Sequence, residues 1–248
     1  MAVAAVLLTA IPLPSQAPSP VPPSAPRTLP GFYRNLIVLD PAHGGRDHGA
    51  QLSSSAVEKD VTLAFAQRLR PALVAQGFTV VSTRDSDPPD ELTSDQRAGT
   101  ANHVRPLACI VLHAAPAGSG VHIVSSSLPA PETGASRRAL VWNKAQAPTV
   151  PMSLRLANEI GLAVDAAHLP VLLMRASIPP IDNLICPAIA IELAPLKGSS
   201  TNVTFANDAG YQQRAVNAIA AGLASFRTHN APPPTTPPGT APRTGATP

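Results

Sequence analysis

The sequence predicts one α/β domain, a three-layer fold in which a twisted, mostly parallel sheet of about six strands carries helices on both faces. Short apolar runs that are typical of buried strands alternate with longer segments whose apolar residues recur at helical spacing. The first unit is a strand at 36–39, a helix ending near residue 76 and a strand at 78–81. This order implies parallel pairing with a right-handed crossover.

The later segments continue the same alternation. We expect further strands at 107–112, 120–126, 171–174 and 188–191, and helices at 93–103, 153–167 and 207–226. Ser55 and Glu58 fit a capping box at the start of the first helix, and Asn207 suits the cap of the last. Pro41 should end the first strand, because it has no N–H to donate. Residues 128–151 show little apolar periodicity and are interpreted as irregular.

The composition divides the 248 residues into one block and two ends. Half of the 30 prolines lie in residues 1–30 and 231–248, which we expect to be a disordered spacer and tail. Residues 31–230 hold all 15 acidic residues and most of the Lys and Arg, so this predicted domain is nearly neutral despite a pI of 9.2. No basic stripe suggests a nucleic-acid partner.

Residues 1–11 are almost wholly apolar and resemble the core of a secretory signal, although no Lys or Arg precedes them. They are too short for a convincing membrane span. We therefore favour an exported protein over a cytoplasmic one with an unstructured end. Cys109 and Cys186 each lie in an apolar run, and we interpret them as buried free thiols.

The ends of the predicted strands carry the residues that can do chemistry. His43 lies just past the first strand, His113 ends the third, and Glu192 ends the last. Glu58 opens the helix that follows the first strand. Because the carboxyl ends of parallel strands share one edge of the sheet, these residues can meet in one crevice. Each also has an ordinary role open to it: a loop histidine, a capping carboxylate, a polar strand end or a charge at the sheet rim.

Two imidazoles and a carboxylate form the His₂Glu set of a catalytic zinc, whose fourth position is left to water. A further carboxylate is then needed to take the proton from that water. We therefore expect Zn²⁺ to be bound by His43, Glu58 and His113, with Glu192 as the general base.

Six stretches carry a more specific resemblance. They read IVLDPAHGG at 37–45, EKDVTLA at 58–64, TRDSD at 83–87, QRA at 96–98 with AN at 101–102, LHA at 112–114 and PAIAIE at 187–192. In this order, over about residues 35–226, they resemble the zinc-dependent N-acetylmuramoyl-L-alanine amidases, bacterial cell-wall hydrolases called amidase type 3. The resemblance implies hydrolysis of the amide bond between N-acetylmuramic acid and L-alanine in peptidoglycan. It also makes His43, Glu58 and His113 the zinc ligands and Glu192 the catalytic glutamate.

The chain departs from that family beside the expected site. Ala42 stands where the family has glycine, Leu112 where it has a small polar residue, and Ala115 where it has asparagine. Residues 193–197 (LAPLK) replace Gly-Phe-Leu-Ser-Asn after the glutamate. These departures bear on substrate contacts and rate more than on metal binding. They also leave open a catalytically impaired protein that binds peptidoglycan or regulates another enzyme, and a different zinc amidase or peptidase on a similar sheet.

The other candidate residues are weaker. His48 could support the site from the glycine loop, and Arg175 could bind a substrate carboxylate. His122, on a strand, and His103 are interpreted as structural or exposed. We expect a monomer that acts on peptidoglycan in the periplasm or cell wall; the sequence names no activator protein.

Overall fold

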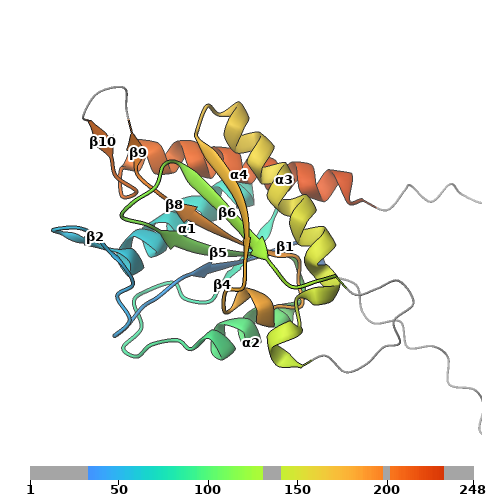
Figure 1. Cartoon of the computed structure of the whole chain (residues 1–248). Helices are drawn as coiled ribbons and strands as arrows, with labels where there is room; N and C mark the ends of the chain where they lie inside the picture. The colour runs from blue at the N-terminus through green and yellow to red at the C-terminus, as the bar shows by residue number, and fades with distance from the viewer. Residues whose placement is uncertain (1–32, 131–140, 198–201, 232–248) are drawn as a thin grey trace, which may run out of the picture. The chain divides into compact units, whose positions relative to one another are not determined.

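A six-stranded sheet forms the centre of the fold (Figure 1). The computed structural model describes residues 33–130, 141–197 and 202–231. The strands lie in the order β4-β1-β5-β8-β6-β7. Their bounds are β1 (Tyr33–Pro41), β4 (Thr79–Ser82), β5 (Pro106–Ala114), β6 (Val121–Ser126), β7 (Val171–Ala176) and β8 (Ala188–Leu193).

All strand pairs in this sheet are parallel except one. Strand β6 runs antiparallel to β8, and β7 then pairs with β6 in parallel. The segment 115–120 between β5 and β6 is too short for a parallel crossover, which accounts for the reversed direction of β6. The expected mostly parallel sheet of six strands is therefore confirmed.

Helices cover both faces of the sheet, as the sequence predicts (Figure 1). The helices α1 (Glu58–Ala75), α3 (Val150–Ala166) and α4 (Ala209–His229) pack on one face, and α2 (Ser94–Val104) packs on the other. The first face buries large side chains such as Phe65, Tyr211 and Phe226. The second buries mainly small ones such as Ala98 and Ala190. His113 and Glu192 project from this second face, because side chains alternate along β5 and β8 and these two lie in phase with residues buried there.

Two predicted helix caps are wrong. The segment before α1 forms a small hairpin of β2 (Gln51–Ser53) and β3 (Ala56–Val57), and Val57 takes the cap position without a side-chain hydrogen bond. Glu58 does not reach back to Ser55, because its carboxylate is engaged by other groups described below. Asp208 rather than Asn207 caps α4, by accepting a hydrogen bond from the Tyr211 N–H.

The two cysteines form a disulfide, so the prediction of free thiols is wrong. Cys109 lies within β5, and Cys186 lies two residues before the first residue of β8, the strand that pairs with β5. This pairing brings the two Cα atoms to 6.1 Å, although the cysteines are 77 positions apart in the chain. The sequence patterns placed each cysteine in an apolar run but not the two runs side by side.

The remaining expectations hold in part. Within residues 128–151, the described residues (128–130 and 141–151) include two short 3-10 helices, η1 (Trp142–Lys144) and η2 (Ala147–Thr149), and α3 begins at Val150, before the expected residue 153. The expected disordered segments, apart from Ala231, lie outside the described residues. Among the described helices, none combines the length and apolarity needed to cross a bilayer.

Candidate metal centre

His43 is held in a tight turn directly after β1. Its backbone adopts the left-handed conformation (φ 64°), and Gly44 and Asp47 close the turn with two backbone hydrogen bonds. The chain then passes close to the site at Gly49, where a Cβ atom would lie 2.6 Å from His43 Cδ2 and 2.7 Å from Glu58 Oε2. Only glycine allows this approach.

Glu58 is fixed by the backbone on both sides. Its Oε2 accepts a hydrogen bond from the Ala50 N–H (2.9 Å), and its Oε1 accepts one from the Ala114 N–H (3.1 Å). Ala50 precedes the small hairpin, and Ala114 ends β5. The carboxylate is therefore held between the start of α1 and the sheet edge, where it is nearly inaccessible to solvent.

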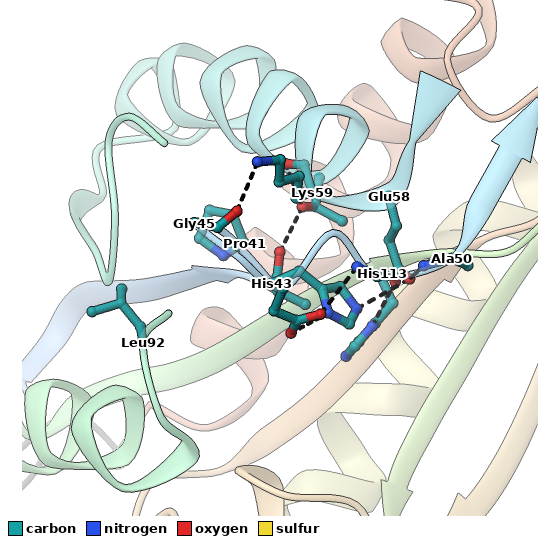
Figure 2. Close-up of polar contacts among 12 residues, drawn as sticks. Pro41, His43, Gly45, Ala50, Glu58, Lys59, Leu92 and His113 are labelled. Atoms are coloured by element: carbon teal, nitrogen blue, oxygen red, sulfur yellow. Dashed lines mark hydrogen bonds and ion pairs between the residues drawn. The ribbon is translucent and has the colours of Figure 1, made fainter. Parts of the chain in front are cut away.

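The carboxylate of Glu58 joins the two histidines (Figure 2). His113 Nδ1 lies 2.8 Å from Glu58 Oε1, and His43 Nε2 lies 3.0 Å from Glu58 Oε2. One potential ligand atom from each residue lies within 4.8 Å of the others. The three ligands predicted from two strand ends and a helix start are therefore brought together, in a geometry that a single metal ion can bridge.

The electrostatics of this cluster favour a cation. Burial alone would raise the pKa of Glu58, but hydrogen bonds from His113, His43 and two backbone N–H groups outweigh it and hold the pKa well below its usual range. The hydrogen bond to Glu58 raises the pKa of His43; burial opposes this rise, and Asp47 adds to it. A metal ion would take the place of the protons that the imidazoles share with this ionised carboxylate.

Asp47 is a site residue that the sequence analysis missed. Its Oδ2 accepts a hydrogen bond from His43 Nδ1 (2.7 Å), and its Oδ1 accepts one from the Gly49 N–H (3.0 Å). A carboxylate on the far ring nitrogen orients a metal-binding histidine and raises its basicity. The structure gives no support to the supporting role expected of His48, which is exposed, whereas Asp47 contacts His43. The sequence shows Asp47 four residues after His43 across two glycines, but this spacing does not by itself define the turn that brings the two side chains together.

Two buried arginines hold the backbone that carries His43. Arg97 forms an ion pair with Asp40 (2.7 Å) and donates to the carbonyls of Pro41 and His43. Arg84 donates to the carbonyls of Pro41, Ala42 and Lys59. Both arginines belong to the family-like stretches quoted above, and in this fold they brace the backbone of the loop rather than contact the ligand side chains.

Glu192 lies next to the cluster but is not one of the three grouped ligands. Its Cα is paired with that of His113 across the parallel strands β8 and β5. Its Oε1 lies 2.8 Å from Nδ1 of His122, a residue that the sequence analysis set aside as structural or exposed. The carboxylate is about one-third exposed, so it can meet a substrate from solvent.

A cavity opens beside the histidines on the α2 face of the sheet. Its lining includes His43, His113, Arg97, Leu92 and the pair Pro179–Pro180. Arg175 does not line this cavity and donates to the carbonyls of Ser126 and Leu128, so the structure gives no support to its proposed role in substrate binding.

The departures from the family pattern fall in different places. Ala42 lines the cavity, whereas Leu112 is fully buried in the core on the opposite face. The Ala115 N–H bonds to the carbonyl of Leu193. After Glu192 the chain forms β9 (Leu196–Lys197), which pairs with β10 (Val203–Thr204). Of the three single-residue departures, Ala42 therefore lies on the cavity wall itself.

Comparison with known proteins gives a consistent result. The family model described as N-acetylmuramoyl-L-alanine amidase matches residues 37–225. An N-acetylmuramoyl-L-alanine amidase of Mycobacterium tuberculosis is 27% identical over 237 residues, which cover 85% of this chain and 93% of that protein. A germination-specific N-acetylmuramoyl-L-alanine amidase of Bacillus subtilis is 48% identical over 62 residues, only 25% of each protein.

Solved structures support the fold. The N-acetylmuramyl-L-alanine amidase Ami1 of Mycobacterium smegmatis superimposes with a TM-score of 0.61 at 21% identity, covering 81% of this chain and all of that one. At this level of identity the likeness concerns the fold. The expected three-layer architecture is thus found in a protein of known structure.

Proposed function

The chain belongs to the N-acetylmuramoyl-L-alanine amidase family, and we propose that it uses zinc for the family's reaction. That reaction is hydrolysis of the amide bond between N-acetylmuramic acid and L-alanine in peptidoglycan. His43, Glu58 and His113 bind the zinc, and Glu192 is the general base. The observation that carries this proposal is the grouping of the three ligand atoms within 4.8 Å, one strand away from Glu192.

The donor set supports zinc. Two imidazoles and one carboxylate are the three protein ligands of several catalytic zinc sites, which keep a fourth position open. Asp47 on the outer nitrogen of His43 completes the carboxylate–histidine arrangement that accompanies such ligands. When bound, zinc would polarise the scissile carbonyl and lower the pKa of a water molecule.

The protein's own groups then move the proton. Glu192 accepts a proton from the attacking water as the water oxygen bonds to the lactyl carbonyl carbon. It delivers that proton to the nitrogen of L-alanine as the C–N bond breaks. The products are a free lactyl carboxyl group on the glycan and a free amine on the stem peptide.

The chain acts on the cell wall, which is where the substrate of its family lies. We propose further that it is exported, as the apolar residues 1–11 suggest, and that it works as a monomer in the periplasm or wall. An activator protein is compatible with this proposal and is not identified by it.

Digestion of purified peptidoglycan sacculi tests the proposal. The zinc-loaded protein should release soluble stem peptides that carry a free N-terminal L-alanine. His113→Ala should bind less zinc, because three protein ligands are few. Glu192→Gln should keep its zinc and hydrolyse sacculi about 10²–10⁴-fold more slowly, which is the usual contribution of a positioned proton-transfer group.

Two outcomes would contradict these assignments. Loss of zinc from Glu192→Gln would make Glu192 a ligand, and near-parental activity would place the base elsewhere. A parental protein that binds sacculi without cleaving them would favour the alternative of an impaired peptidoglycan-binding module.

A further inference from the structure

We propose that His122 is a positioning residue for Glu192: its Nδ1–H holds one oxygen of the carboxylate, so that the other oxygen faces the water that attacks the substrate. This inference rests on the proposed role of Glu192 as the general base. It adds a residue that lies outside the three ligands and outside the family-like stretches.

Strand register places Glu192 between two histidines. In the parallel pair β5–β8, His113 is the partner of Glu192, and in the antiparallel pair β6–β8, His122 is its partner. The three residues therefore form a row across neighbouring strands, which lie about 4.8 Å apart. Partners in register project from the same face of a sheet, so Glu192 has a ligand histidine on one side and His122 on the other.

Glu192 makes its hydrogen bond on the side away from the cluster. The distance from His122 Nδ1 to Glu192 Oε1 is 2.8 Å, which fits a hydrogen bond from an imidazole N–H to a carboxylate. The His122 side chain is 13% exposed and that of Glu192 is 34% exposed. The donor is thus more deeply buried than the base that it holds. Because Oε1 is engaged in this hydrogen bond, Oε2 is the oxygen that accepts the proton.

The loop between β5 and β6 packs against the His122 ring. At Gly118, where φ is +106°, a Cβ atom would lie 2.6 Å from Cε1 and 3.1 Å from Nε2 of that ring. The backbone therefore lies against the Cε1–Nε2 edge of the imidazole, and a larger residue at position 118 would displace the ring. A ring held in this way can fix a glutamate that would otherwise sample several rotamers.

Substitution of His122 tests the proposal. His122→Leu removes the donor and should lower kcat by about 10–100-fold, the usual effect of losing a partner of a site residue. KM and zinc content should stay at parental values, because neither the ligands nor the substrate surface change. His122→Asn offers an amide N–H close to the former Nδ1 position and should recover most of the lost rate.

A matched control lies on the far side of the molecule. His229 Nδ1 and Glu159 Oε1 form a similar pair at 2.7 Å between α4 and α3, two helices that do not carry Glu192 or the three proposed ligands. His229→Leu should leave kcat unchanged. Parental kcat in His122→Leu, a higher kcat, or an equal loss in the His229 control would overturn the proposal.

A double substitution separates this inference from the proposed function. In the Glu192→Gln background, His122→Leu should cause no further loss, because the two residues act on the same proton transfer. A full additional loss would mean that His122 acts elsewhere, which would overturn the proposal. Parental activity in Glu192→Gln alone would refute the base assignment, and with it this inference. An inactive Glu192→Gln beside a fully active His122→Leu would refute the inference only.

A measurement without turnover gives an independent readout. In the metal-free protein, ring ¹⁵N NMR should find a proton on His122 Nδ1, because the hydrogen bond to Glu192 selects that tautomer. Glu192→Ala should shift the proton toward Nε2. A parental ring protonated on Nε2 alone would contradict the proposal.

Discussion

The Asp47 carboxylate determines how His43 faces the cluster. It holds His43 Nδ1 at 2.7 Å, so that Nε2 points toward Glu58. Asp47→Asn weakens this contact and should lower zinc affinity by about 10–100-fold. Competition with a chelator measures the affinity. Asp90→Asn, which changes only an exposed partner of Arg46, is the matched control, and equal affinities in the two variants would contradict this role.

The strand ends predicted three of the site residues together, because parallel topology alone places His43, His113 and Glu192 on one edge. Asp47 and His122 escaped prediction for different reasons. The position of Asp47 depends on a turn through glycines with positive φ, which a sequence pattern does not describe. The contact of His122 depends on β6 lying antiparallel beside β8, a long-range pairing that the strand pattern does not reveal.

The disulfide links the two central strands of the sheet at the end away from the metal centre. Cys109 and Cys186 close a loop with a sequence separation of 77 residues, for which the chain-entropy account gives a stabilisation of up to about 4.5 kcal/mol. The double variant Cys109→Ala/Cys186→Ala should therefore unfold at lower denaturant concentration than the oxidised parent. A reducing agent should shift the parent toward the variant. Identical unfolding midpoints for the oxidised parent and the double variant would contradict the bond.

Helices α3 and α4 pack closely at Gly222, where a Cβ atom would lie 2.6 Å from Ile160 Cα. Gly222→Ala should destabilise the fold by about 1–3 kcal/mol, since backbone must move to admit the methyl group. Gly99 in α2 is the matched control because nothing lies within 4 Å of its would-be Cβ. Gly99→Ala should be neutral or stabilising by up to about 1 kcal/mol. Equal midpoints in thermal unfolding would refute the close packing.

The elements themselves were predictable, but their starting residues were less so. Apolar runs and helical spacing reflect burial, which a local pattern records directly. The capping box predicted at Ser55 does not form, because the Glu58 carboxylate instead makes hydrogen bonds with His113 and the Ala114 N–H. The free-thiol interpretation failed because disulfide pairing depends on which strands are neighbours, as the β5–β8 pair shows.

At the scale of the whole molecule, the sheet brings chemistry from distant parts of the chain to one edge. The buried core runs from Ile37 to Phe226, which lies within the predicted domain 31–230. The boundaries of that domain, and the disorder expected on either side of it, stay predictions. The candidate metal centre and Glu192 are held by β1, α1, β5 and β8, so the proposed activity depends on the assembled fold.

The central claim is that this fold hydrolyses the muramoyl–alanine amide bond, and isotope labelling tests it most directly. Sacculi are digested by the zinc-loaded protein in H₂¹⁸O, and the masses of the products are measured by mass spectrometry. One ¹⁸O atom should appear in the lactyl carboxyl group of the glycan product, and none in the released stem peptide. A label in a peptide carboxyl group, or at a sugar anomeric carbon, would show that a different bond is cleaved and would contradict the account.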